Sequence, residues 1–368
     1  MKKIISVLAA ALYLVLCLMI PACAEEGAEE PVLESEGYRY RLLEDGTVEI
    51  LKYVAGDFDP VLPDTLDGHP VTSIGEEVFS DYRYSVNELT IPASVTHIGS
   101  GAFSMTDLEE IEIPAGVVSM GDNPFSYCMR LKTITVAEGN PVFHVEEGVL
   151  FCREDHSLMA FPNMLADPYE NEDEDEDAVA ELTYTVPAGT EIIRADAFGG
   201  VECLSEIFLP DSLLVIGPQA FGFCYGLDRI TIPDSVTEIG EAAFDTCTSL
   251  DRAVLPAGLE RIPSMLFYEC ESLVEIVFPE SLAEIGDGAF FCSGLEQIRI
   301  PDGVTVIEAS AFEGSSSLKT VVIPDSVQSI GESAFDFCSE NLVITCGPDS
   351  FTKTYCEQNG IAFRTEPQ

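Results

Sequence analysis

The sequence has no tryptophan, only four histidines and few basic residues. Lys and Arg number 17 against 65 Asp and Glu, which gives a formal net charge of −48. A chain this acidic would repel the phosphates of nucleic acids and the anionic headgroups of lipids. We therefore expect no nucleic-acid partner and a solvated acidic surface that could attract cations or basic partners.

The motifs of common catalytic and metal sites are also missing. There is no Gly-x-Ser-x-Gly elbow, no phosphate-binding glycine-rich loop and no Cys-x-x-Cys pair. The four histidines are scattered over different turns, at His69, His97, His144 and His156. Carboxylate pairs are inevitable among 65 acidic residues, so they do not indicate a glycosidase. We predict a non-enzymatic protein without a cofactor or metal site.

The N-terminal residues have the pattern of an export signal. Lys2 and Lys3 precede an apolar stretch over 4–20, and Ala22-Cys23-Ala24 fits a signal-peptidase site. This pattern predicts a signal peptide over 1–24, an acidic linker over 25–36 and a secreted protein. In the alternative, Ile20-Pro21-Ala22-Cys23 is a lipobox and Cys23 carries a lipid anchor at the cell surface. An uncleaved anchor is a third reading, but the stretch is slightly short for a membrane span.

A repeat of 22 or 23 residues occupies most of the chain. Each unit has a phenylalanine eleven residues after a proline, nine times in nine. The prolines are Pro92, Pro114, Pro187, Pro210, Pro233, Pro256, Pro279, Pro301 and Pro324, and the phenylalanines are Phe103, Phe125, Phe198, Phe221, Phe244, Phe267, Phe290, Phe312 and Phe335. Such a period predicts a solenoid, in which one unit alone cannot bury its apolar side chains but a stack buries them continuously.

The spacing within one unit predicts its path. In the unit that ends at Phe244, Ile230 and Ile232 alternate as a strand requires, and Pro233 ends that strand because it has no N–H to donate. Val236 and Ile239 then point inward from the next side of the coil. We expect about twelve such rungs, each adding one strand to a parallel β-sheet.

The repeat resembles the BspA-like leucine-rich repeats. Its pattern is Leu-x-x-Ile-x-Ile-Pro-x-x-Val-x-x-Ile-Gly-x-x-Ala-Phe-x-x-Cys, over about residues 37–365. The resemblance implies an α/β-type repeat solenoid, a right-handed leucine-rich-repeat superhelix. It also implies an adhesion or interaction protein, common on the surface of host-associated bacteria, with host matrix or cell-surface proteins as partners.

The irregular segments divide the chain further. We predict a β-hairpin cap over 37–72, repeats over 73–137 and 182–345, and a short helix–strand cap over 346–368. Between the repeats, 138–165 is predicted to be a projecting β-hairpin insertion, with no phenylalanine at the expected offset. The segment 166–181 contains six consecutive carboxylates at 172–177 and is predicted to be a disordered loop, favoured over a calcium site because it lacks glycine and spaced ligands.

Cysteine is concentrated in one column of the repeat. Five cysteines follow the phenylalanine by three residues, namely Cys128, Cys224, Cys247, Cys270 and Cys338, and Cys292 comes one residue earlier. Disulfides or a metal row would suit an exported protein. We favour buried thiols, because side chains in equivalent positions point in parallel and this opposes disulfide geometry. Cys346 and Cys356 in the C-terminal cap are the strongest exception.

The outward positions of the strands offer a candidate partner-binding face. Residues two and four before each proline alternate with the core positions. On this face three arginines lie beside outward-facing apolar residues. The candidate residues are Glu206, Phe208, Arg229, Thr231, Arg252, Val254, Glu275, Val277 and Arg299. This composition is typical of interfaces, although ordinary strand propensity also favours Val, Thr and Phe. We predict a monomer that binds a protein partner, with a structural envelope role as the alternative and a carbohydrate-active enzyme last.

Overall fold

The computed structural model describes residues 31–55, 60–79, 86–165 and 181–366. The chain divides into a unit over 1–32 and a unit over 33–368, and the description below concerns the second. The predicted signal peptide and Cys23 lie outside the described residues, as does nearly all of the predicted acidic loop.

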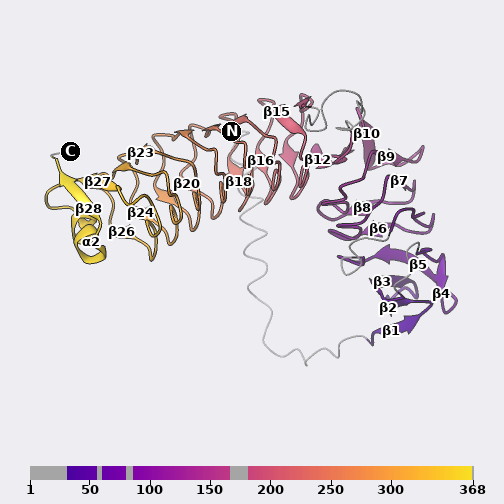
Figure 1. Ribbon diagram of the computed structural model, residues 1–368. Coiled ribbons are helices and arrows are strands. Elements are labelled where there is room, and N and C mark those ends of the chain that lie inside the picture. The colour runs from indigo at the N-terminus through magenta and orange to yellow at the C-terminus, as the bar shows by residue number, and fades with distance from the viewer. Residues whose placement is uncertain (1–30, 56–59, 80–85, 166–180, 367–368) are drawn as a thin grey trace, which may run out of the picture. The chain divides into compact units, whose positions relative to one another are not determined.

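The second unit is a parallel β-solenoid of about 13 turns, as the repeat predicts. Most repeats give two short strands, which pair in parallel with the equivalent strands of neighbouring repeats (Figure 1). The first ladder consists of β7 (Glu110–Ile113), β9 (Thr133–Val136), β13 (Leu182–Thr185), β15 (Leu204–Phe208), β17 (Arg229–Thr231), β19 (Arg252–Val254), β21 (Glu275–Val277), β23 (Gln297–Arg299), β25 (Thr320–Val322) and β27 (Val343–Cys346). The second consists of β5 (His69–Ile74), β6 (His97–Ile98), β8 (Ser119–Met120), β14 (Ile192–Ile193), β16 (Val215–Ile216), β18 (Glu238–Ile239), β20 (Arg261–Ile262), β22 (Glu284–Ile285), β24 (Val306–Ile307) and β26 (Ser329–Ile330).

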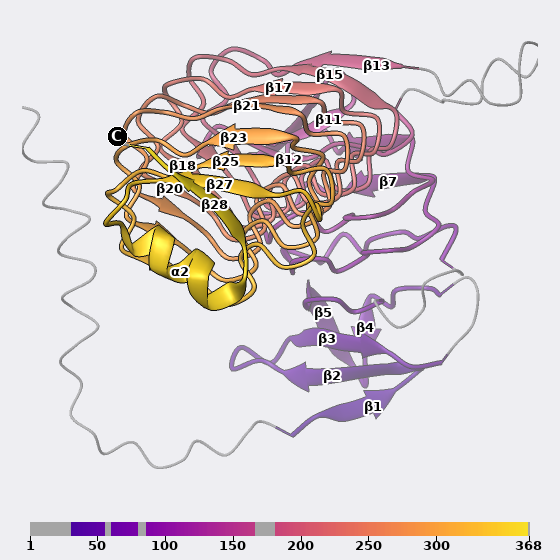
Figure 2. The ribbon, with the colours of Figure 1, turned by 60° about the vertical axis from the view of Figure 1, so that its left-hand side comes forward.

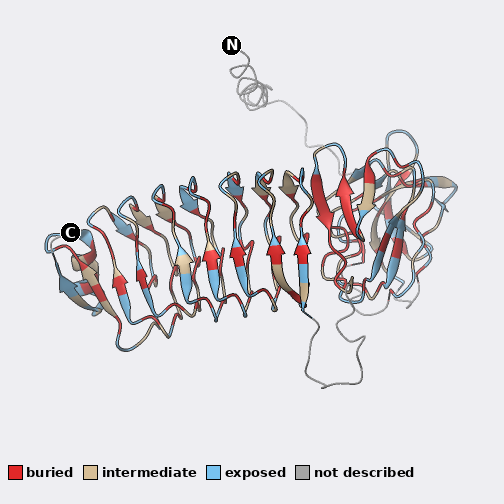
Figure 3. Ribbon diagram, turned by 90° about the horizontal axis from the view of Figure 1, so that it is seen from above, coloured by how far each residue is buried: buried red, intermediate tan, exposed pale blue. Residues whose placement is uncertain are grey.

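The residues of one unit show why the coil takes this path. Ile230 and Ile232 are buried from the first ladder, and Ile239 is buried from the second, with exposed residues between them. Figure 3 shows buried and exposed stretches alternating along the coils in the same way. On the third side the turns are joined by backbone hydrogen bonds, such as Phe221 N to Ala243 O at 2.8 Å. Most coils are therefore tied to their neighbours on all three sides, which satisfies the backbone groups that burial would otherwise leave unpaired. The first ladder is interrupted between β21 and β23, and the second between β18 and β20.

The phenylalanines form one stack of rings through the core. Neighbouring rings lie parallel, with centroids 4.9 Å apart between Phe198 and Phe221 and 5.1 Å apart between Phe221 and Phe244. Phe161 also belongs to this column, 5.0 Å from Phe198. The sequence showed no phenylalanine at the repeat's offset in the insertion, and the spacing did not assign Phe161 to the column. The insertion lengthens its coil, so the residue that fills the column no longer keeps the repeat's offset.

The cysteine column is a ladder of free thiols, which are buried at Cys128, Cys224, Cys247 and Cys270 and half-buried at Cys338. The thiol of Cys224 donates to Phe198 O at 3.2 Å, and Cys247 donates to Phe221 O at 3.2 Å. Burial raises the pKa of the Cys128 thiol to about 11, so it stays protonated and remains a donor at neutral pH. Ser293 and Ser315 occupy the column in two other units, where Ser315 Oγ donates to Phe290 O at 3.0 Å. The small side chain in this column therefore caps the carbonyl of the preceding coil.

Caps of the predicted kinds lie at both ends. At the N-terminal end, β1 (Leu33–Ser35), β2 (Tyr38–Leu42) and β3 (Val48–Tyr53) pair antiparallel, β3 joins β5 in parallel, and β4 (Thr65–Leu66) pairs with β5. At the C-terminal end, α2 (Phe351–Asn359) begins at Ser350, whose side chain accepts from Lys353 N, and β28 (Ala362–Thr365) pairs with β27 (Figure 2). The caps cover the apolar end coils that the stack would otherwise expose.

The insertion forms three strands that separate two hydrophobic cores. It contains β10 (Phe143–Glu146), β11 (Val149–Cys152) and β12 (Ser157–Ala160), which pair antiparallel in order, and β12 then pairs in parallel with β14. The prediction that this hairpin projects is wrong, because every residue of β11 and β12 is buried. Alternate side chains pack into two different cores: Val149 and Phe151 into the C-terminal one, Leu150 and Cys152 into the N-terminal one.

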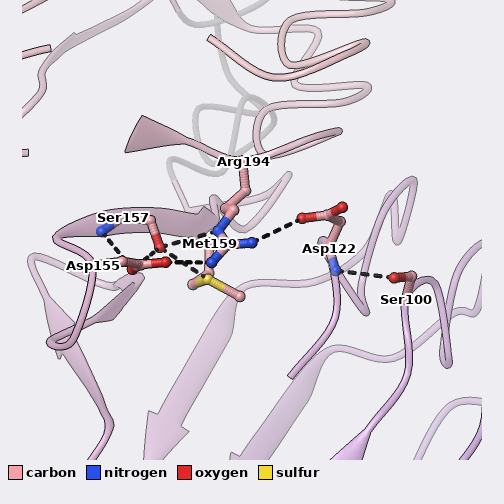
Figure 4. Close-up of polar contacts among 6 residues, drawn as sticks. All are labelled: Ser100, Asp122, Asp155, Ser157, Met159 and Arg194. Carbon is pink, nitrogen blue, oxygen red and sulfur yellow. Dashed lines mark hydrogen bonds and ion pairs between the residues drawn. The ribbon is translucent and has the colours of Figure 1, made fainter. Parts of the chain in front are cut away.

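Arg194 joins the insertion to the repeats on both sides of it (Figure 4). Its guanidinium pairs with Asp155 in the β11–β12 turn and lies 3.4 Å from Asp122 Oδ1 in the N-terminal repeats. Burial would raise the pKa of Asp155, but the hydrogen bond from Ser157 and the charge of Arg194 hold it below its usual value. The ion pair therefore stabilises the junction with Asp155 ionised.

Candidate binding face

The first ladder brings the predicted face residues of four strands together. The register aligns Glu206 with Arg229, Arg229 with Arg252, and Arg252 with Glu275. A second row aligns Thr231 with Val254 and Val254 with Val277. Phe208 and Val277 are 50% and 41% exposed, well above the buried residues that alternate with them. We call the surface formed by Glu206, Phe208, Arg229, Thr231, Arg252, Val254, Glu275 and Val277 the arginine face.

The charges on the arginine face are only partly paired. Arg252 Nε lies 3.3 Å from Glu275 Oε1, and both side chains are about half exposed. Arg229 makes no ion pair with the described residues, and its neighbours in register are Glu206 on one side and Arg252 on the other. Like charges directly opposite on adjacent strands are unfavourable. Two adjacent arginines on a strongly acidic chain are therefore suited to an acidic group on a partner.

Arg299 lies apart from the rest of the predicted face. Its strand β23 pairs with β25, and β21 ends the preceding sheet. A cleft of about 850 Å³ lies between β21 and β23, and its lining includes Val277, Phe278 and Arg299. The break coincides with the 22-residue step from Pro279 to Pro301, in which one residue is missing from the turn before β23. The other 22-residue step, from Pro92 to Pro114, likewise adjoins a cleft, of about 600 Å³.

The chemistry for a metal site is not assembled in the described part of the chain. No group of three or more His, Cys, Asp or Glu residues lies close enough to hold a metal ion there. Nor is any described helix long and apolar enough to cross a membrane.

The repeat pattern did not predict a hollow that lies on the third side of the coil. Tyr127, Phe223 and Tyr225 meet there, with centroids 5.8 Å apart between Tyr127 and Phe223. Tyr127 comes from the repeats before the insertion and the other two from the repeats after it. The repeat pattern does not reveal such a meeting, because these positions vary from unit to unit and the insertion separates them along the chain.

The ladders, the phenylalanine column and the two caps define a leucine-rich-repeat solenoid. A family model described as BspA type leucine rich repeat region matches residues 66–154, 182–291 and 247–356 with six copies, so the chain belongs to this family. The comparison with curated proteins gave no match.

Solved structures of bacterial repeat proteins are similar to the chain. A leucine-rich repeat protein from Eubacterium ventriosum is 20% identical with a TM-score of 0.66, over 83% of this chain and 94% of that one. One from Bacteroides ovatus is 21% identical with a TM-score of 0.48, over 91% and 100%. A leucine rich cell surface protein from Faecalibacterium prausnitzii is 21% identical with a TM-score of 0.40, over 92% and 100%. At these identities the first likeness supports the fold alone.

Proposed function

We propose that the protein is an exported interaction or adhesion module that binds a protein partner through the arginine face. The observation that carries the proposal is the pair Arg229 and Arg252, aligned on adjacent strands beside exposed Phe208 and half-buried Val254. Arginine and aromatic side chains are enriched where proteins bind one another. The parallel sheet fixes the backbone beneath them, so binding has to order only the side chains themselves.

The charge of the surface favours a particular kind of partner group. The chain has 65 acidic residues, yet two adjacent outward positions of the first ladder are arginines. A carboxylate of the partner could contact both guanidiniums, which relieves their mutual repulsion and adds charge-assisted hydrogen bonds. Repulsion from the surrounding acidic surface would disfavour acidic proteins that do not align with this pair, and this would make binding selective.

Export is part of the proposal. The family includes bacterial surface proteins, and the pattern over 1–24 supports secretion, with lipidation of Cys23 as the alternative. Mass spectrometry of the mature N-terminus distinguishes the two, because cleavage before Glu25 and lipidation at Cys23 give different masses. Host matrix or cell-surface proteins are the partners we propose for a displayed protein of this kind.

A structural role in the envelope, without a dedicated ligand, is the second candidate. Ordinary strand propensity would then account for Val254, Val277 and Thr231. A carbohydrate-active enzyme ranks last, since leucine-rich-repeat solenoids are generally non-enzymatic. A positive glycan-hydrolysis screen would reverse that order.

The test is a double substitution, Arg252→Glu with Val254→Glu. Bound proteins are captured from an extracellular-matrix extract, identified, and titrated against each variant. The matched control is Arg130→Glu with Val118→Glu, which changes charge and apolar surface equally at exposed positions off this face. Binding should weaken at least tenfold in the first variant only. Equal binding by both variants would rule out the arginine face.

A further inference from the structure

The hollow at Tyr127 is a cavity of about 670 Å³ on the turn side of the coil. Its apolar lining comes from Met105, Tyr127, Met129, Phe223 and Tyr225, and its acidic lining includes Asp196 and Glu202. No Lys, Arg or His is among the residues that line it. We call this cavity the aromatic notch. It belongs to different elements from the arginine face and, unlike that face, has no basic residue in its lining.

The insertion explains why the notch exists. The Phe161 coil lies between the coils of Phe125 and Phe198, and its turn is drawn inward: Asn163 donates to Gly199 O at 3.0 Å, and Met164 N donates to Leu131 O at 2.8 Å. The flanking turns therefore lack a full-sized neighbour between them. Tyr127 leans across this space toward Phe223, which makes an aromatic wall from residues 96 positions apart along the chain.

Glycines make room for the Tyr127 ring. A Cβ added to Gly200 would lie 3.2 Å from Tyr127 Cδ1, and one added to Gly199 or Gly222 would lie 3.4 Å from Tyr127 atoms. The position that Gly199 and Gly222 hold, directly after the phenylalanine, is occupied by Asp245, Tyr268 and Phe291 in later units. The backbone here is thus bare where Tyr127 approaches it, and larger side chains would fill the notch.

Asp196 places a partly buried carboxylate in the lining of the notch. Its Oδ1 is buried and has no hydrogen-bond partner in the structure. Burial raises the pKa of Asp196 to about 6, and the nearby Asp122 adds to the rise while the Tyr127 hydroxyl opposes it. A cation beside this carboxylate would favour its ionised form and offset the cost of its burial.

We propose that the aromatic notch binds an arginine side chain of a partner polypeptide. The guanidinium would pair with the Asp196 carboxylate, and its planar face would lie against the ring of Phe223, which stands at 80° to that of Tyr127. Such a group satisfies a buried carboxylate and interacts favourably with aromatic faces at once. The aliphatic part of the side chain would pack against Met105 and Met129, which are 38% and 40% exposed. The acidic rim would draw cationic groups toward the site.

The matching variants distinguish this site from diffuse attraction to an acidic protein. Asp196→Asn removes the charge, and asparagine suits the left-handed backbone of this residue, φ +54°. Its control is Glu313→Gln, which removes one charge from the turn of another coil. Phe223→Ala removes the aromatic wall, and its control is Phe337→Ala, in the same column and equally left-handed but 80% exposed.

The probe is the capped peptide acetyl-Gly-Arg-Gly-amide, titrated into purified protein and followed by ligand-observed NMR at near-physiological salt. Circular dichroism checks that each variant is folded. The dissociation constant should rise at least about fivefold in Asp196→Asn and Phe223→Ala and stay within about twofold in both controls. Equal weakening of binding by Glu313→Gln would mean diffuse attraction to an acidic protein. Equal binding of the lysine analogue would mean that the notch recognises positive charge alone. Either result overturns the proposal. Neither depends on the arginine face.

Discussion

The phenylalanine column should be the main stabilising feature of the array, and Phe221→Ala tests it. Phe221 is completely buried and its ring lies between those of Phe198 and Phe244, at 4.9 and 5.1 Å. Truncating a buried phenylalanine costs about 3–5 kcal/mol through lost burial and the cavity that remains. Two aromatic contacts are lost as well, so we expect a value near the top of that range, about 5 kcal/mol.

Guanidinium chloride unfolding followed by far-ultraviolet circular dichroism measures the loss. The control is Phe337→Ala, 80% exposed, which should change the free energy of unfolding by less than about 0.5 kcal/mol. Because each coil contacts only its neighbours, a local loss can unfold a few coils first, and a separate early transition would also count as destabilisation. A loss under about 1 kcal/mol without a new transition would refute the view that the ring stack holds the coils together.

Two further predictions concern the junction around the insertion. Arg194→Ala should lower the free energy of unfolding by about 2 kcal/mol, because it breaks charge-assisted bonds to Asp155 and Asp122. Asp155 has a depressed pKa in the folded protein, so its stabilising contribution is present above its ordinary pKa and is lost as the pH falls through the folded pKa. Denaturation midpoints measured across acidic pH should therefore fall less steeply in Arg194→Ala than in the wild type. An unchanged profile would contradict the ion pair. Asp196 has the opposite sign: its folded pKa of about 6 lies above the ordinary value of 3.8, so stability falls as the pH rises between them, with Tyr127 and Asp122 as the facing groups. Asp196→Asn should therefore raise stability at neutral pH by about 1–2 kcal/mol and abolish that slope, and equal slopes in variant and wild type would contradict the raised pKa.

The sequence predicted the regular parts of the fold well. Proline and phenylalanine spacing identified the coil and the core columns, because each repeat imposes the same packing on its neighbours. Turn and helix-end signals outside the repeats identified the caps. It also predicted which strand positions point outward, such as Arg229 and Arg252, since a strand alternates its faces. These features depend only on local periodicity, which one sequence displays in full.

The insertion and its surroundings could not be predicted in the same way. Phe161 joins the ring stack at an offset that no other unit uses, and β11 is apolar on both faces because it divides two cores. The meeting of Tyr127 with Phe223 depends on how far the insertion draws its turn inward. The one signal of the notch in the sequence was glycine at Gly199 and Gly222, where later units carry larger residues. That signal can be interpreted only once the structure shows the Tyr127 ring lying over these glycines.

The arginine face is the central claim about function, and one comparison tests it most directly. A partner identified by capture from extracellular matrix is titrated against wild-type protein, the Arg252→Glu and Val254→Glu variant, and the Arg130→Glu and Val118→Glu control. We predict a dissociation constant raised at least tenfold in the first variant and unchanged in the control. Wild-type affinity in the first variant would contradict the claim, and so would equal weakening in both.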